Sequence, residues 1–203
     1  MLESRKAFLI NAVLNYFSSL CPITPGFILE IEKNVEPLLV KKNKYILSPM
    51  DNNDYVFFVV SGLVRGFIKD GNKEITTWIS LGEEFIGAIQ HPDADIQPSI
   101  EYLQALENSE LVAIPHLLID KLYANYQETN VIGRKILALQ YHAASERSII
   151  ARIPSAERRY EKFLELNSLD ISRVPLRCIA SYLGMRLETL SRIRSKLVKE
   201  PMW

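Results

Sequence analysis

The 203-residue chain carries 24 Lys and Arg and 24 Asp and Glu, so its formal net charge is zero, and 48% of its residues are hydrophobic. This composition is typical of a globular protein with packed cores, and no apolar run reaches the roughly 18 residues that a membrane span needs. The amphipathic start, MLESRKAFLINAVLNYF, contains an acidic residue, so we expect neither secretion nor membrane insertion but a cytoplasmic protein.

The first half of the chain changes from a helical to a strand pattern. Residues 2–37 have periodic apolar positions on either side of a break at 21–26, which predicts helices. Between Lys44 and Ile114, short β-branched or aromatic runs follow one another: YVFFVV, LVRGFI, EITTWI and LVAI. Gly, Asn, Asp and Ser mark turns between them, so a small antiparallel sandwich or barrel is predicted.

Strand patterning ends after Pro115, where a helix over 117–126 and a long helix over about 128–153 are predicted. Five apolar residues of the long helix recur at near-heptad spacing, which would suit a seam against another helix. Packing against the chain's own sheet is the alternative that the pattern leaves open. The five residues are Ile132, Ile136, Leu139, Ala143 and Ile150.

A break at Ile153-Pro154-Ser155 ends the long helix and gives the expected domain boundary. Ser155 is a suitable N-cap for a further helix over 156–166. Beyond the break the chain has ten Lys and Arg against six Asp and Glu, whereas residues 1–153 have fourteen against eighteen. Phosphate neutralisation needs local basic groups only, so the terminal segment has the sign that suits DNA.

The sequence VPLRCIASYLGMRLETLSRIRSKL, residues 174–197, is typical of a DNA-reading helix-turn-helix. Ile179, Ala180 and Leu183 give the first helix an apolar side, and Gly184 can adopt the left-handed conformation of a sharp turn. In the second helix, Leu190, Ile193 and Leu197 share one face and polar residues occupy the other. A plain surface hairpin of two helices is the alternative.

The exposed face of this second helix carries groups that can read bases. Glu188 can accept a hydrogen bond from cytosine N4, and Arg192 can bind guanine O6 and N7. The two are four residues apart, so both point to the same groove, and a salt bridge between them could orient the arginine.

The order of parts resembles the cyclic-AMP receptor protein and fumarate-nitrate regulator (CRP/FNR) family of bacterial transcription factors. SAERRYEKFLELN, RVPLRCIASYLGM and ETLSRIRSKL are particularly similar to family members. The resemblance implies an α+β fold with three parts: a jelly-roll-like sensor domain with flanking helices (1–127), a long dimerisation helix (128–153) and a winged helix-turn-helix domain (154–203). It also implies a homodimer on double-stranded DNA, with RNA polymerase as a further partner.

The resemblance assigns the DNA-binding role to Glu188, Ser191 and Arg192, and Thr189 and Ser195 lie on the same helix. Many members have Ser or Thr before this helix, where the present chain has Arg186, so capping must come from elsewhere. Arg186 could contact phosphate instead, and Leu187 could touch a thymine methyl.

In the sensor domain, Gly82 and Glu83 match the turn that meets the ribose in cyclic-nucleotide-binding members. Ser99 matches the serine of their phosphate-binding pair, but no arginine occurs from Lys73 to Lys121. An unpaired buried phosphate is costly, and the acidic loop 91–95 would repel it, so cyclic AMP is not expected to bind in the usual way. Glu83 is then a turn residue, and the effector is an unknown small molecule or none.

Other chemistry has weaker support in the sequence. The chain has two cysteines, Cys21 and Cys178, which are too few for an iron–sulfur cluster, and we expect both to be reduced, with Cys178 half-buried. His91, His116 and His142 are scattered, so neither a metal nor another cofactor is expected. An enzyme is not predicted, because no catalytic motif is present. A ligand-binding or protein-interaction module with a vestigial DNA-binding half is the alternative function.

Overall fold

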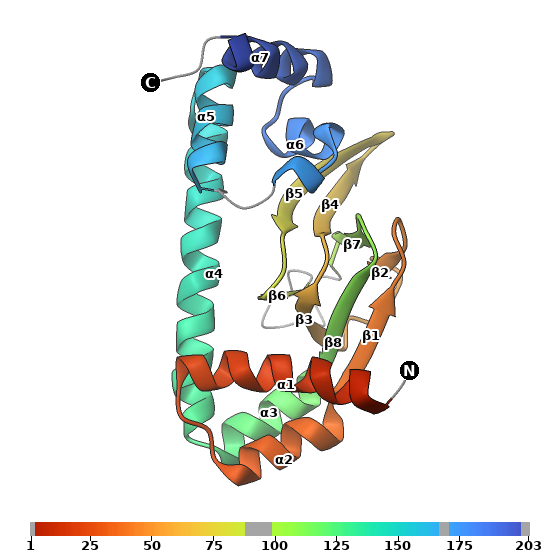
Figure 1. The fold of residues 1–203 in the computed structure, drawn as a ribbon, viewed down its shortest axis with the longest axis vertical. Coiled ribbons are helices and arrows are strands. Elements are labelled where there is room, and N and C mark those ends of the chain that lie inside the picture. The colour runs from red at the N-terminus through yellow and green to blue at the C-terminus, as the bar shows by residue number, and fades with distance from the viewer. Residues whose placement is uncertain (1–2, 88–98, 167–170, 200–203) are drawn as a thin grey trace.

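The computed structural model describes residues 3–87, 99–166 and 171–199. It confirms the α+β class (Figure 1). The helices are α1 (Glu3–Leu20), α2 (Pro25–Asn34), α3 (His116–Asn125), α4 (Glu128–Arg152), α5 (Ala156–Leu166), the short 3-10 helix η1 (Ile171–Arg173), α6 (Leu176–Tyr182) and α7 (Leu187–Lys199). The strands are β1 (Glu36–Val40), β2 (Tyr45–Leu47), β3 (Tyr55–Ser61), β4 (Val64–Asp70), β5 (Lys73–Ser80), β6 (Glu84–Ile86), β7 (Tyr102–Ala105) and β8 (Ser109–Pro115).

The strands form two four-stranded antiparallel sheets, in the orders β1-β8-β3-β6 and β2-β7-β4-β5. Strand β3 is apolar almost throughout because both of its faces are covered. Phe57 and Val59 point into the core between the sheets, while Phe58 belongs to a second core under the amino-terminal helices. The predicted sandwich is therefore confirmed, with helices over one of its outer faces.

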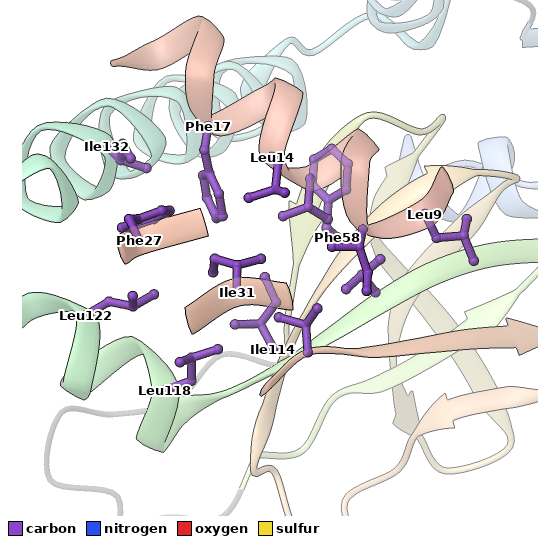
Figure 2. Packing of buried hydrophobic residues seen from close by; sticks show 14 residues of the cluster. Leu9, Leu14, Phe17, Phe27, Ile31, Phe58, Ile114, Leu118, Leu122 and Ile132 are labelled. Atoms are coloured by element: carbon purple, nitrogen blue, oxygen red, sulfur yellow. The ribbon is translucent and has the colours of Figure 1, made fainter. Parts of the chain in front are cut away.

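The second core joins α1, α2, α3 and the start of α4 to the sheet that contains β3 and β8 (Figure 2). Phe17, Phe27 and Phe58 are among the buried side chains of this cluster. Thr24 caps α2 by accepting a hydrogen bond from Phe27 N at 3.3 Å, and its hydroxyl donates to Glu128 at 2.7 Å. This contact fixes the start of α2 against the start of α4.

Strand β1 begins at Glu36, inside the segment for which a helix was predicted as far as Pro37. Its partner is β8, with Leu38 opposite Leu111. The pairing joins segments far apart in the sequence, so local periodicity carries no sign of it. Pro37 is tolerated because β1 lies at the edge of its sheet, where a missing N–H leaves fewer ladder bonds broken.

Helix α4 runs along the molecule from α1–α3 at one end to α5–α7 at the other (Figure 1). Ile132 is buried in the amino-terminal core, and Ile150 is buried in a third core among the carboxyl-terminal helices. Leu63 and Leu106, next to β4 and β7, complete that third core. The predicted break is confirmed, because α4 ends at Arg152 and Ser155 Oγ accepts a hydrogen bond from Arg158 N at 3.4 Å.

The carboxyl-terminal helices dock on the β4–β5 hairpin. Ser181 Oγ of α6 donates to Glu74 O at 2.8 Å and accepts from Thr76 N at 2.9 Å. Cys178 of α6 is fully buried at this contact, which is deeper than expected, and burial raises the pKa of its thiol. Arg173 of η1 pairs with Glu107, which lies between β7 and β8. All elements in described residues 156–166 and 171–199 are helical, so the predicted β-wing is not among them.

Candidate functional site

Helices α6 and α7 form the predicted helix-turn-helix. Gly184 has φ +61°, and Met185 N donates to Ala180 O at 2.9 Å while Gly184 N donates to Ser181 O at 3.1 Å. This pair of bonds is the Schellman arrangement that ends a helix in a left-handed residue. An added Cβ at Gly184 would meet no atom within 4 Å, so the backbone angle, and not space, requires glycine there.

One side of α7 packs into the protein. Leu190 is fully buried, and Ile193 is nearly so, in the third core with Ile179 and Leu183 of the first helix and turn. Lys196 Nζ pairs with Glu157 of α5 at 3.0 Å, which fixes the far end of α7. These contacts hold α7 in one orientation and leave its other side to solvent.

The solvent side of α7 carries most of the residues predicted to bind DNA. Arg186, Glu188, Ser191, Arg192 and Ser195 are exposed, while Thr189 is half-buried. Ser195 Oγ donates to Ser191 O at 3.0 Å. Within the described residues Glu188 and Arg192 form no ion pair with each other or with other groups, so the suggested salt bridge is absent and both side chains remain available.

The residue before α7 is Arg186, whose carbonyl oxygen accepts from Leu190 N at 3.1 Å. Its side chain has no acceptor atom, so it cannot cap the helix as Ser or Thr would. Leu187 is also exposed. The exposed surface of Arg186, Leu187, Glu188, Ser191, Arg192 and Ser195 is called the reading face below.

The five residues predicted for the dimer seam do not share one environment. Ile132 and Ile150 are each 3% exposed and pack within the chain, and Ile136 packs against the amino-terminal core. For Ile132 and Ile150 the alternative of packing within the chain holds, whereas Ile136 is only partly buried. Ala143 is half-buried, whereas Leu139 is 54% exposed.

Another side of α4 is apolar and exposed. Leu137, Tyr141 and Ile149 are 66%, 77% and 59% exposed, and Ala138 and Ala144 lie exposed beside them. Large apolar side chains that gather on one helix face are unusual on a surface that only water covers. These five residues are called the outer face of α4.

The residues that match the cyclic-nucleotide site form turns and hydrogen bonds within the protein. Gly82 and Glu83 both have positive φ, at +111° and +54°, and Glu83 N donates to Val59 O at 2.7 Å. Glu83 therefore lies in the turn between β5 and β6, and its role there stays a prediction. Ser99 Oγ accepts from Glu101 N at 3.2 Å. The predicted acidic loop 91–95 lies outside the described residues.

A cavity of about 670 Å³ is bounded by strands of both sheets, by α1, α2 and α3, and by α4. Its lining includes none of Gly82, Glu83 and Ser99. Its walls are mostly apolar, and Glu84 and Arg147 are the ionisable side chains of opposite charge among them. Burial raises the pKa of Glu84, and the nearby positive charge of Arg147 opposes that shift. Sequence reasoning missed both residues, because Glu84 follows a turn and Arg147 lies in a helix 63 positions later.

Other site types find no support in the described ranges 3–87, 99–166 and 171–199. No group of three His, Cys, Asp or Glu residues there could hold a metal ion. In the same ranges, no helix has the length and apolar character needed to cross a membrane.

The comparisons with known proteins give matches at the level of structure. No family model and no curated protein sequence matches the chain. Among solved structures, FixK2 from Bradyrhizobium japonicum superposes with a TM-score of 0.69 and 20% identity, covering 82% of this chain and 85% of that one. A transcriptional regulator of the CRP/FNR family from Eubacterium rectale gives 0.68 and 20%, covering 92% and 88%.

The chain has a CRP/FNR-like fold. A further structure with this fold is the c-di-GMP-responsive regulator CLP from Xanthomonas campestris, with a TM-score of 0.66 and 16% identity, covering 87% of this chain and 93% of that one. At these identities the likeness concerns the CRP/FNR fold itself.

Proposed function

We propose that the chain is a transcription regulator that binds double-stranded DNA through the reading face of α7. The observation that carries this proposal is that α7, the second helix of a helix-turn-helix, is packed on one side and exposes Glu188 and Arg192 on the other. Neither of them has an ion-pair partner in the part of the chain that the structure describes. The first turns of such a helix enter the major groove. Solved structures with the same fold are those of transcription regulators, which supports the proposal.

The chemistry of the reading face suits base recognition. Arg192 would donate two hydrogen bonds to guanine O6 and N7, and Glu188 would accept from cytosine N4. Arg186 would contact phosphate at the edge of the groove, and Leu187 would meet a thymine methyl. The excess of basic residues after Pro154 would supply sequence-independent attraction to the backbone.

The proposal includes a homodimer that reads an inverted repeat. The outer face of α4 exposes Leu137, Tyr141 and Ile149, and a second copy would bury these side chains. Two helix-turn-helix units would then reach half-sites about one helical turn, or 34 Å, apart. RNA polymerase would be a further partner of the bound dimer in the cytoplasm.

The sensor domain is proposed to work without cyclic AMP bound in the usual way. Glu83 and Ser99, which match the nucleotide site, form hydrogen bonds within the protein. The buried Arg65 of β4 does not replace the missing phosphate-binding arginine, because it is already bonded to Gln104 at 2.7 Å and paired with Glu74. No resident cofactor is proposed. The role is regulatory and not catalytic.

Selection from a random double-stranded DNA library tests the proposal, using the full chain at two salt concentrations. We expect one inverted repeat to be enriched, and its affinity to fall by at least tenfold between 50 and 200 mM salt, as is usual for proteins that neutralise several phosphates. Enrichment of no sequence, or an affinity that does not depend on salt, would instead support a vestigial DNA-binding half.

A further inference from the structure

The cavity beside α4 has the size and chemistry of a small-molecule site. Its volume of about 670 Å³ lies within the roughly 300 to 1,000 Å³ of known ligand pockets. Phe17 and Phe85 contribute aromatic rings, and Val56, Ile114 and Ile136 contribute aliphatic walls. Most of the lining is apolar, so the body of a ligand would have to be apolar as well.

Several polar groups of the lining are already bonded within the protein. Thr129 Oγ1 donates to Leu122 O at 3.0 Å, and Gln140 Nε2 donates to Phe85 O at 3.0 Å. By contrast, the guanidinium of Arg147 and the indole N–H of Trp78 have no hydrogen-bond partner among the described residues. Both are donors, so a ligand that fits must bring acceptor atoms.

The charged side chains of the cavity lining indicate which polar head group a ligand would carry. Arg147 is half-buried and is the arginine of the lining, so it would attract an anion and repel a cation. A carboxylate matches the planar guanidinium with two parallel hydrogen bonds. Glu84 of β6 also lines the cavity, and its carboxylate would oppose a phosphate dianion more strongly than a monoanion.

We propose that this cavity binds an apolar monocarboxylate, with the carboxylate on Arg147 and the hydrocarbon body against the rings of Phe17 and Phe85. The site is built by Glu84 and Arg147, and so differs from the turn at Gly82 and Glu83 that resembles a nucleotide site. It can be tested without DNA, so its failure and the failure of DNA binding are distinguishable.

Trp78 gives a direct optical readout, because it lines the cavity and lies against Gly66 of the neighbouring strand. Replacing the other tryptophan, Trp203→Phe, leaves Trp78 as the single tryptophan of the chain. Decanoate, decan-1-ol, decyl phosphate and decyltrimethylammonium would be titrated below their aggregation concentrations. Calorimetric titration of the unaltered chain would detect any binding that leaves the fluorescence unchanged.

We expect saturable binding of decanoate, at least tenfold weaker binding of decanol, and weaker binding still of the cationic probe. Arg147→Gln should weaken decanoate at least tenfold and leave decanol unchanged, and Arg147→Lys should fall between the two. Arg152→Gln is the matched control, because Arg152 is exposed on the same helix and donates to Ser148 O at 2.9 Å. Circular dichroism would verify the fold of each variant.

Three results would overturn the proposal: no saturable binding of decanoate by either method, equal affinities for decanoate and decanol, or an unchanged decanoate affinity in both Arg147 variants. Tighter binding of decyl phosphate than of decanoate would overturn the assignment to a monocarboxylate. If Arg147→Gln does not fold, the Arg147→Lys variant decides between these outcomes.

Discussion

The reading face of α7 and the cavity beside α4 each hold an arginine that has no hydrogen-bond partner among the described residues, but in opposite surroundings. On α7, Arg192 stands in water beside exposed polar groups, whereas Arg147 is half-buried among apolar walls. A charge in water binds a polyanion through long-range attraction that salt weakens, whereas a charge in an apolar cavity selects a single small anion. The contrast teaches that the surroundings of an arginine, more than its presence, indicate its partner.

Helix α4 packs against the cores next to both regions and so connects them. Ile132 anchors this helix in the amino-terminal core near the cavity, and Ile150 anchors it in the core that supports α7. Arg147 lies between these anchors, and its charge also lowers the pKa of Tyr182 of α6, although burial raises that pKa more strongly. Substitutions that affect one region alone therefore test how independent the two are.

The largest effect is expected for Leu190→Ala. Leu190 is fully buried under α7, so the change should cost about 2 to 5 kcal/mol, as other buried Leu→Ala changes do. Leu187→Ala, on the exposed side of the same helix, should cost less than about 0.5 kcal/mol. Urea unfolding measures both. Equal losses would show that α7 is not packed as described.

Gly184→Ala should destabilise the turn between α6 and α7 by about 1 to 2 kcal/mol, because φ is positive there and alanine is strained in that region. Gly184→Asn should cost less, since asparagine tolerates the left-handed region better. Thermal unfolding compares the two variants. A cost as large for Asn as for Ala would place the cause elsewhere than in the backbone angle.

Tyr141→Asp is expected to weaken self-association at least tenfold, which corresponds to about 1.4 kcal/mol, by placing a charge on the outer face of α4. The control is Lys6→Ala, an exposed change on α1. Sedimentation equilibrium measures the dissociation constants. If the natural chain is monomeric at all concentrations, or if both variants associate equally well, α4 does not form the interface.

The smallest effect is expected for Glu84→Gln, which concerns the cavity alone. Burial raises the pKa of Glu84 above its ordinary value of 4.5, so the folded state holds its proton to higher pH than the unfolded state. The part of the free energy of unfolding that comes from protonated Glu84 is lost as pH rises from 4.5 through the pKa of Glu84 in the folded state. The Gln variant should lose less stability over this interval. Parallel pH dependences of the unfolding free energy in the two proteins would contradict this.

The fold was predictable where each element carries its own pattern. Strand β3 shows as an apolar run, and the turn at Gly184 shows as a glycine between two amphipathic segments. Strand β1 and the cavity were not predictable, because each depends on residues distant in sequence. The same holds for α4, whose even apolar spacing conceals that Ile132 and Ile150 face inward while Tyr141 faces outward.

Of the candidate sites, the reading face was predictable because its residues lie on one short helix and its periodicity separates Leu190 from Glu188. The lack of a salt bridge between Glu188 and Arg192 depends on side-chain geometry, which spacing alone does not determine. The cavity needed the structure, since only the fold brings Glu84 beside Arg147.

The base preference of an Arg192→Ala variant tests the central claim most directly. We expect the variant to bind the selected repeat at least tenfold more weakly and to lose its preference for guanine at one symmetric pair of positions, as removal of a bidentate base contact predicts. Lys6→Ala should keep both affinity and preference. An Arg192→Ala variant with unchanged affinity and an unchanged preferred sequence would contradict the assignment of α7 as the DNA-reading helix.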